Sequence, residues 1–213
     1  MREFSLHVKK CLSKAEKLET KLPDVIFDIH GMSGRMGRIF LNELCSPQWV
    51  KYLEIGSWKG STICSASYDN PGKFVACDNF CELKSFGGTK DDILQNRQMM
   101  GGRCNFSFIE CECWDLPSRL DDKFNIYFFD GPHDYDSHFR AIIDFYEYLE
   151  DSCIIVIDDW NDRSGAVQTA TENAIKHCGF CVHFRHSVGH FKEADDWGWW
   201  NGFGIYVLEK TTL

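Results

Sequence analysis

Short apolar segments alternate with amphipathic segments along most of this 213-residue chain, and this alternation restricts the fold more than any other feature. Patterns typical of strands cover residues 52–55, 73–77, 105–109, 124–129, 153–157, 180–186 and 204–208. Helical periodicity covers residues 3–21, 33–44, 61–67, 91–100, 137–149 and 165–177. Strands that alternate with helices predict an α/β fold. We expect a mostly parallel seven-stranded sheet with helices on both faces and an antiparallel C-terminal strand.

The length fits a single domain, and the sequence contains no internal repeat or Pro/Ser-rich linker. We expect residues 1–46 to form helices that cover the ligand site and residues 50–213 to form the α/β core. No secretory signal is visible, and no apolar run approaches the roughly 20 residues that span a membrane. The 11 cysteines are an odd number, which is typical of free buried thiols in a reducing compartment. A cytoplasmic location is therefore expected.

The net charge of -9 restricts the class of partner. An acidic surface repels phosphate backbones and anionic membranes. The charge therefore predicts a small-molecule or glycan partner rather than a nucleic acid or a membrane, and it leaves a homodimer open.

Acidic residues recur where the apolar strands end. Glu54 lies within the first strand, Asp78 follows the second, Asp130 follows the fourth, and Asp158 and Asp159 follow the fifth. The carboxyl ends of parallel strands meet at one edge of a sheet, where open α/β folds bind ligands. Burying a carboxylate costs on the order of several kcal/mol unless it is paired or bound. The repetition therefore predicts a ligand site at this edge.

The turn after the first strand indicates the kind of ligand. Residues 54–60 read E-I-G-S-W-K-G, and the two glycines allow a tight turn that a ligand can approach closely. A dinucleotide site would show G-x-G-x-x-G instead. Glu54 disfavours a diphosphate and suits a cation such as the sulfonium of S-adenosylmethionine, while Asp78 suits ribose hydroxyls. A turn without any ligand is the alternative.

Several segments in order resemble the class I S-adenosylmethionine-dependent methyltransferases. They cover residues 31–44, 52–62, 77–80, 128–135, 157–160 and 199–204. Together they are similar to a metal-dependent small-molecule O-methyltransferase subfamily of the sugar and macrolide type. The resemblance implies a Rossmann-like fold, S-adenosylmethionine as cofactor and methylation of a hydroxyl on a small polyol, with a sugar or glycan terminus as the leading candidate.

The resemblance also implies which residues bind the cofactor. They are Met32, Ser33, Glu54, Gly56, Ser57, Trp58, Gly60, Thr62, Asp78, Asn79, Phe80, Glu112, Cys113, Trp114 and Asp130. Among these, Asp78 is expected to bind ribose and Phe80 to cover the adenine. Cys111 stands where relatives tend to have glycine, and core packing of Cys111 and Cys113 is the alternative interpretation.

Asp130, Asp158 and Asp159 are the candidate metal ligands. Carboxylates on adjacent strand ends repel one another and acquire raised pKa values unless a cation intervenes. Oxygen ligands suit a hard ion such as Mg²⁺. The set resembles the metal triad of catechol O-methyltransferase, which has asparagine in place of Asp159. The alternative is that some of these acids cap a helix or form a salt bridge.

His133 and Asp130 are the candidate catalytic residues, with His133 as the general base. The unperturbed pKa of histidine, roughly 6.5, lies close to working pH. Alternatively, His133 orders its loop or binds substrate. The predicted acceptor contacts are Tyr135, Trp160, Trp199 and Trp200. Indole rings stack on sugars or aromatic acceptors, although a hairpin packed on the core explains the tryptophans equally well.

Two other functions are compatible with the same strand and helix pattern. An NAD-dependent oxidoreductase of the Rossmann type lacks support from the glycine spacing and leaves the three aspartates unexplained. A methyltransferase-like binding module without catalysis is disfavoured by the intact turn and the intact acids.

Overall fold

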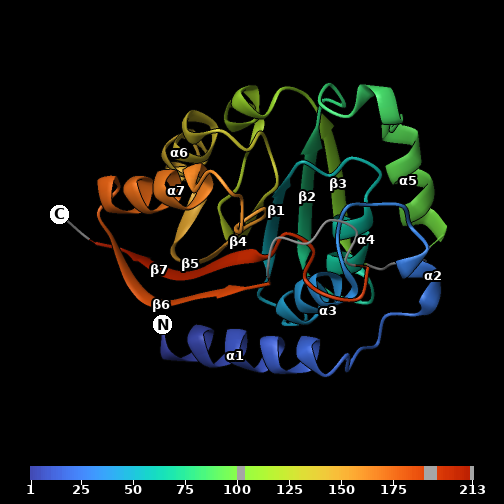
Figure 1. The fold of residues 1–213 in the computed structure, drawn as a ribbon, viewed down its shortest axis with the longest axis horizontal. Coiled ribbons are helices and arrows are strands. Elements are labelled where there is room, and N and C mark those ends of the chain that lie inside the picture. The colour runs from blue at the N-terminus through green and yellow to red at the C-terminus, as the bar shows by residue number, and fades with distance from the viewer. Residues whose placement is uncertain (100–103, 190–195, 212–213) are drawn as a thin grey trace.

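A computed structural model describes residues 1–99, 104–189 and 196–211 of the chain. Its sheet has the strand order β3-β2-β1-β4-β5-β7-β6 (Figure 1). The strands are β1 (Lys51–Ile55), β2 (Lys73–Asp78), β3 (Asn105–Glu110), β4 (Phe124–Phe129), β5 (Leu149–Ile157), β6 (Phe180–Val188) and β7 (Phe203–Lys210). Strand β7 pairs antiparallel with both β5 and β6, and the other pairs are parallel. The predicted mostly parallel α/β sheet is confirmed.

Seven α-helices are described: α1 (Arg2–Glu16), α2 (Asp24–Phe27), α3 (Arg35–Leu44), α4 (Ser61–Ser67), α5 (Lys90–Met99), α6 (Tyr135–Ile143) and α7 (Ala166–His177). Two predicted helix ends are wrong. The helix expected to reach residue 21 ends at Glu16, and Leu18 takes a left-handed φ of 56°. The helix expected over 137–149 ends at Ile143, because Leu149 already pairs with β4 as the first residue of β5. Residue 100 of the helix expected over 91–100 lies outside the described residues.

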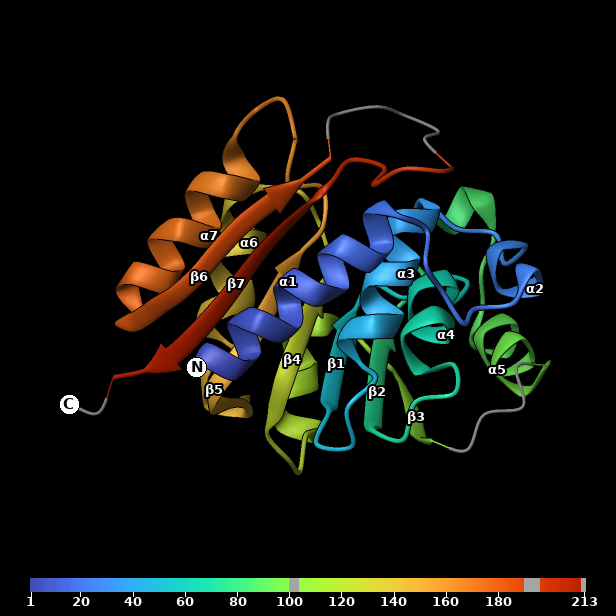
Figure 2. The same ribbon diagram turned by 90° about the horizontal axis from the view of Figure 1, so that it is seen from below.

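Alternate side chains of the central strands enter two separate apolar cores. All six residues of β4 are buried. Ile126 and Phe128 pack with residues of α1, α3 and α4, whereas Tyr127 and Phe129 pack with residues of α6 and α7. Figure 2 shows α1, α3 and α4 over one face of the sheet, with α6 and α7 behind it. Because period-2 alternation places both sets in apolar surroundings, the sheet is buried on both faces.

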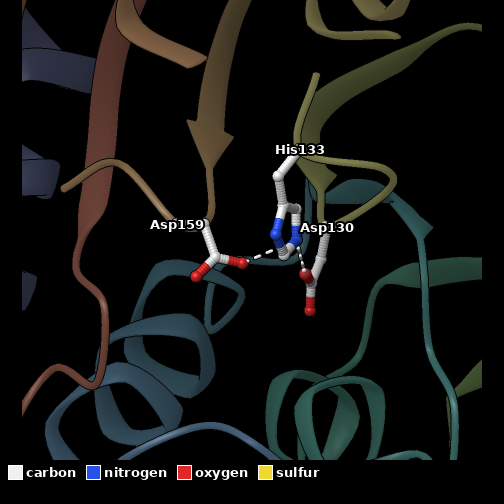
Figure 3. A group of neighbouring side chains, drawn as sticks. All are labelled: Asp130, His133 and Asp159. Atoms are coloured by element: carbon white, nitrogen blue, oxygen red, sulfur yellow. Dashed lines mark ion pairs between the residues drawn. The ribbon is translucent and has the colours of Figure 1, made fainter. Parts of the chain in front are cut away.

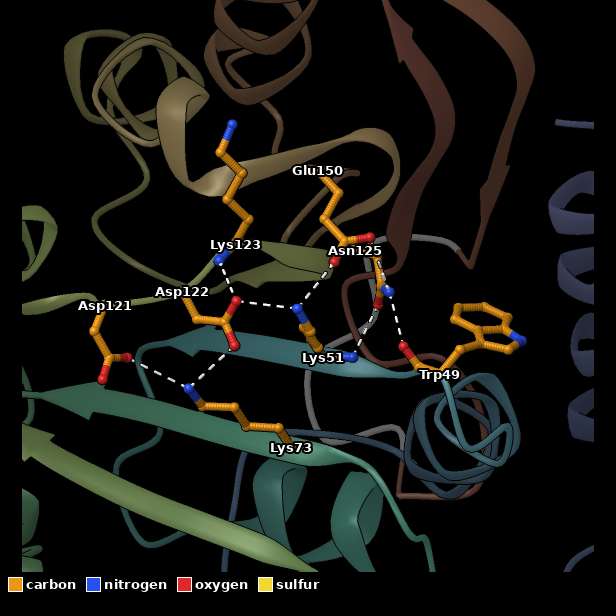
Figure 4. Close-up of polar contacts among 8 residues, drawn as sticks. All are labelled: Trp49, Lys51, Lys73, Asp121, Asp122, Lys123, Asn125 and Glu150. Atoms are coloured by element: carbon orange, nitrogen blue, oxygen red, sulfur yellow. Dashed lines mark hydrogen bonds and ion pairs between the residues drawn. The ribbon is translucent and has the colours of Figure 1, made fainter.

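The amino ends of the central strands are tied together by lysines and acids (Figure 4). Lys51 Nζ lies 3.0 Å from Asp122 and 3.4 Å from Glu150, and Lys73 Nζ lies 3.3 Å from Asp122. Asn125 accepts a hydrogen bond from the Lys51 backbone N–H at 2.9 Å. At this end of the sheet, each of these acids has a cationic partner.

Within the residues that the structure describes, none of the helices is both long and apolar enough to cross a membrane.

Candidate active site

A cavity of about 610 Å³ lies at the carboxyl ends of the parallel strands. This volume is within the range usual for small-molecule sites. Its walls come from the turns that follow five strands: residues 56–58 after β1, 78–83 after β2, 111–114 after β3, 130–133 after β4, and 158–159 after β5. The structure therefore brings the strand-end acids Asp78, Asp130, Asp158 and Asp159 to one cavity.

Most residues predicted to bind the cofactor line this cavity. They are Met32, Ser33, Gly56, Ser57, Trp58, Thr62, Asp78, Asn79, Phe80, Glu112, Cys113, Trp114 and Asp130. Met32 and Ser33 are the part of residues 1–46 that lines it, whereas α1 packs against α3 and β6. Residues 1–46 were expected to form helices that cover the cofactor site. The part of this segment that reaches the cavity is the loop before α3.

Glu54 and Gly60 lie outside the cavity lining. Glu54 is fully buried and accepts hydrogen bonds from Tyr52 Oη at 2.7 Å and from Thr62 Oγ1 at 2.9 Å. Burial raises the pKa of Glu54 to about 7. Gly60 precedes α4 with a left-handed φ of 87°. The hydrogen bond from Thr62 to Glu54 links α4 to β1, so this carboxyl group stabilises the turn between the two elements.

Gly56 is required where the turns after β1 and β4 touch. Its φ is 85°, and its N–H donates to the carbonyl oxygen of Cys77 at 2.9 Å. A Cβ atom at this position would lie 1.7 Å from the carbonyl oxygen of Asp130. Residues with a side chain are therefore excluded both by the backbone angle and by the contact.

Asp78 fixes the turn after β1 from the neighbouring strand. Its carboxylate accepts hydrogen bonds from the backbone N–H groups of Trp58, at 2.7 Å, and of Phe80, at 2.6 Å. Each carboxylate oxygen has a second lone pair. Asp78 can therefore also accept hydrogen bonds from hydroxyl groups of a ligand in the cavity.

Cysteine side chains form part of the wall next to Trp114. Cys77 Sγ lies 3.6 Å from Cys111 Sγ, and both are buried. Burial raises the pKa of Cys113 to about 12. The Cys113 thiol therefore stays neutral, and the three side chains form apolar wall, which agrees with the core-packing interpretation of Cys111 and Cys113.

His133 lies between two carboxylates at the ends of β4 and β5 (Figure 3). Its Nε2 atom is 2.7 Å from Asp159 Oδ2 and 4.0 Å from Asp130 Oδ1. One potential ligand atom from each of these three residues lies within 4.8 Å of the others. The metal set expected from the sequence contained Asp158 in place of His133. Asp158 lines the same cavity but is only 5% exposed.

Burial and neighbouring charges set the pKa values of the side chains in this cluster. Burial raises the pKa of Asp130 to about 6, and burial together with the charges of Asp130 and Asp159 also raises the pKa of Asp158 well above its ordinary value. Hydrogen bonding to Asp130 and Asp159 raises the pKa of His133 to about 11. With these carboxylates as its partners, His133 is protonated at neutral pH and donates to Asp159, in contrast to the ordinary pKa assumed for a general base.

Asn201 is a site residue that sequence reasoning missed. It lines the cavity, and its Nδ2 donates to Asp159 Oδ1. The turn that carries it is attached to the end of β5, because the Asn161 N–H donates to the Asn201 carbonyl at 3.1 Å. The antiparallel register, in which Ile157 pairs with Gly204, brings this turn to Asp159. The sequence carried no signal for this contact, because the register between the two strands is set in the assembled sheet. Asp162, which follows β5, also lines the cavity and was missed.

Of the four predicted acceptor contacts, Trp200 lines the cavity and the other three do not. Trp160 is 4% exposed and packs near Tyr206. Trp199 is buried against Phe40 and Phe203. Tyr135 is exposed outside the cavity, and its hydroxyl accepts a hydrogen bond from Asn173. Core packing therefore accounts for Trp160 and Trp199.

The cavity lining is acidic, and the imidazolium of His133 is the cation that its described residues supply. It contains seven carboxylates: Asp78, Glu82, Glu112, Asp130, Asp158, Asp159 and Asp162. Among the described residues, its lining includes no lysine or arginine, in contrast to the lysine pairs at the other end of the sheet. This electrostatic environment favours a ligand with positive charge and disfavours a pyrophosphate.

The strand order, with β7 antiparallel between β5 and β6, and the cavity at the strand ends define the class as Rossmann-like class I methyltransferases. Residues 53–160 match the model of a family described as a methyltransferase domain. The chain belongs to this methyltransferase family.

Solved structures share the fold at low sequence identity. Cofactor-bound Rv0187 from MTB has a TM-score of 0.62 at 17% identity, with 96% of this chain and 90% of that chain covered. The O-methyltransferase TomG from Streptomyces achromogenes, solved with S-adenosylmethionine, gives 0.59 at 16%, with 95% and 89% covered. TrmN from Thermus thermophilus gives 0.57 at 16%, with 87% of this chain covered, and the chain spans only 52% of TrmN. No curated protein sequence matches the chain.

Proposed function

We propose that the protein is an S-adenosylmethionine-dependent O-methyltransferase that methylates a hydroxyl of a small polyol, with a sugar or glycan terminus as the leading candidate. The acidic cavity at the strand ends carries this proposal. S-adenosylmethionine has a sulfonium and an ammonium group, so seven lining carboxylates suit it. The same lining is unfavourable for the pyrophosphate of NAD. This argues against the alternative function of an NAD-dependent oxidoreductase.

The cofactor has a defined orientation in this proposal. The turn of Gly56 to Trp58 holds the methionine portion, Asp78 accepts hydrogen bonds from the ribose hydroxyls, and the wall of Phe80, Cys113 and Trp114 encloses the adenine. This places the reactive methyl group toward Asp130 and Asp159. The support is the order of these residues around one cavity.

A divalent cation fits the acids at the acceptor end. Asp130, Asp158 and Asp159 would hold it, and carboxylate oxygens are the ligands that Mg²⁺ prefers. Once a cation displaces its proton, the nearby imidazole of His133 also suits Mn²⁺ or another transition ion. When bound, such a cation lowers the pKa of a neighbouring hydroxyl and orients it.

The chain itself aligns the reactants and manages the proton. Methyl transfer needs the acceptor oxygen, methyl carbon and sulfur in line, and enclosure in one cavity favours this alignment. In this proposal Asp130 accepts the proton of the acceptor hydroxyl, and the protonated His133, 4.0 Å from Asp130, can donate a hydrogen bond to the acceptor oxygen. Trp200 supplies an aromatic ring in the same wall.

We also propose that the protein is cytoplasmic and that its partner is a small molecule. All 11 cysteines are free thiols, as expected in a reducing compartment.

Binding experiments test the cofactor first. Calorimetry is expected to show binding of S-adenosylmethionine and S-adenosylhomocysteine, and none of NAD. At a concentration of about 100 times the Kd, S-adenosylmethionine should stabilise the fold by roughly 2.7 kcal/mol. Binding of NAD without binding of S-adenosylmethionine would contradict the proposal.

Methyl transfer is tested by a mass-shift screen of methyl glycosides, phenols and polyols, with and without EDTA. We expect a gain of one methyl group that EDTA suppresses. Asp159→Ala should abolish transfer and retain S-adenosylmethionine binding, while Asp144→Ala, which removes an acid paired with Arg140 outside the cavity lining, should change neither. Cofactor binding without transfer to any acceptor class would identify a binding module instead.

A further inference from the structure

A second cavity, of about 470 Å³, shares part of its wall with the first. Met32, Ser33 and Trp200 line both cavities. The remaining wall of the second cavity comes from residues 27–31, from the first turns of α3 and from Asp196 and Trp197. The two cavities therefore meet at these residues, and Trp200 directly precedes Asn201, which contacts Asp159 in the first cavity.

Trp197 is held in a fixed position at this second cavity although the residue is 62% exposed. The N–H groups of Arg35 and Met36, at the start of α3, donate to the carbonyls of Asp196 at 2.8 Å and Gly198 at 3.1 Å. Such N–H groups have no partner within their own helix. These bonds on both sides of Trp197 fix its backbone.

The side chain of Arg35 fixes the ring itself. Its guanidinium lies 4.5 Å from the ring centroid of Trp197 and 4.2 Å from that of Phe27. A cation between two aromatic rings stabilises both in one arrangement. The indole is thus pre-organised, while much of its surface remains available for a flat ligand.

The charges of the second cavity balance, unlike those of the first. Asp28 and Asp196 are opposed by Arg35 and Arg38. Arg38 is 4% exposed and donates to the carbonyl of Ile29 at 3.0 Å, so it supports the loop that forms the wall. A cavity with balanced charges and an exposed indole fits a neutral ring that carries polar groups at its edge.

We propose that the second cavity is an outer subsite for the acceptor, which binds a neutral ring with an apolar face against Trp197. The acceptor hydroxyl lies near Asp130 and Asp159, and the rest of the acceptor extends across Met32 and Trp200. Asp28 and Asp196 accept hydrogen bonds from the edge of the outer ring. This inference rests on the proposed function, because it requires an acceptor in the first cavity. The outer ring is a second sugar unit or an aryl group, and both offer the same stacking face.

The test uses three sets of probes: methyl monosaccharides, the corresponding methyl disaccharides and p-nitrophenyl monosaccharides. Binding is measured by calorimetry and by the indole N–H resonance of Trp197 with S-adenosylhomocysteine present. We expect a disaccharide or an aryl glycoside to shift this resonance. Trp197→Ala removes one stacking contact and should weaken the affinity for that probe about three- to tenfold.

Matched variants separate stacking from folding. Trp49→Ala removes another exposed tryptophan, which stacks on Phe4 away from both cavities, and should leave probe affinity unchanged. Trp197→Phe retains a ring and should bind the probe better than Trp197→Ala. All three variants should bind S-adenosylmethionine like the parent chain.

The outcomes are distinct. Preference for the disaccharide identifies a glycan acceptor, and preference for the aryl glycoside identifies an aromatic aglycone; either supports the subsite. The subsite proposal is overturned if no probe shifts the Trp197 resonance, or if Trp197→Ala binds the probes as tightly as the parent chain does. Either result overturns it even where methyl monosaccharides are methylated. Failure of the parent chain to bind S-adenosylmethionine would instead refute the proposed function.

Discussion

Glu54 is surrounded by donors and apolar side chains, and its environment determines when it ionises. Tyr52 and Thr62 donate to its two oxygens, and the side chain is fully buried. Because burial disfavours the charged carboxylate, the folded protein binds the Glu54 proton more tightly than the unfolded chain does. Glu54 therefore links stability to pH.

This linkage has a definite sign. The pKa of Glu54 is raised from 4.5 to about 7, so its contribution is fully present below about pH 4.5 and is lost as the pH rises to about 7. Its upper limit is about 3 kcal/mol. Urea unfolding of the parent chain and Glu54→Gln should show that the stability of the parent relative to the variant falls over this pH range. A difference independent of pH would show that the Glu54 carboxyl has an ordinary pKa.

At the residue scale, the sequence identified the acids of the cavity lining, because acids at strand ends meet at one edge of a parallel sheet, and the family resemblance implied most of the other expected lining residues. It did not identify the protonation of His133. That depends on the 2.7 Å contact with Asp159, which comes from another strand. Nor did it separate Trp200 from Trp199, since adjacent residues in a turn point in directions that only packing fixes.

Tight connections between elements set the geometry of the cavity. The turn after β1 touches the end of β4 at Gly56, and the turn before β7 touches the end of β5 at Asn201. In the first place a close backbone contact positions Asp130, and in the second the Asn201 side chain donates a hydrogen bond to Asp159.

Gly56→Ala should be among the most damaging single substitutions. The new Cβ meets the Asp130 backbone at a residue with φ of 85°, so we expect a loss of about 3 kcal/mol or more in stability. Gly165→Ala is the matched control, because Gly165 also has a left-handed φ of 70° but its Cβ position meets only Gln168 at an ordinary contact distance of 3.6 Å. It should cost only about 1–2 kcal/mol. Thermal unfolding measures both, and equal losses would argue against the contact.

Asn201→Ala should weaken the acceptor end without unfolding the protein. Removing a group that orients a ligand carboxylate commonly reduces metal affinity or activity about 10- to 100-fold. We expect a loss of this size in Mn²⁺ affinity, with S-adenosylmethionine affinity unchanged. Asn173→Ala, which removes a donor to Tyr135 outside the cavity lining, is the control. Unchanged Mn²⁺ affinity in Asn201→Ala would mean that Asp159 needs no support from Asn201.

The whole molecule separates its charges by position. At the amino ends of the strands Lys51 and Lys73 neutralise the acids, whereas at the carboxyl ends seven carboxylates face one cavity. The resulting potential acts on the charge of the methyl donor. S-adenosylmethionine has a sulfonium, and S-adenosylhomocysteine has a neutral sulfur.

Salt should therefore weaken binding of S-adenosylmethionine more than binding of S-adenosylhomocysteine. Between about 0.01 M and 1 M salt, the Debye length falls from about 30 Å to about 3 Å. Calorimetry over this range should show a several-fold larger loss of affinity for the charged cofactor. An identical salt dependence of the two would indicate that the acidic lining does not act on the sulfur position.

The amino-acid sequence by itself determined the α/β class, the strand-end position of the acids and the glycine turn after β1, because periodicity and backbone freedom are local properties of the chain. Only the tertiary structure decided that His133 joins Asp159, that Asn201 reaches the same carboxylate and that a second cavity lies beside Trp197. These features depend on contacts between segments far apart in the sequence, whose register and packing are set by the assembled sheet.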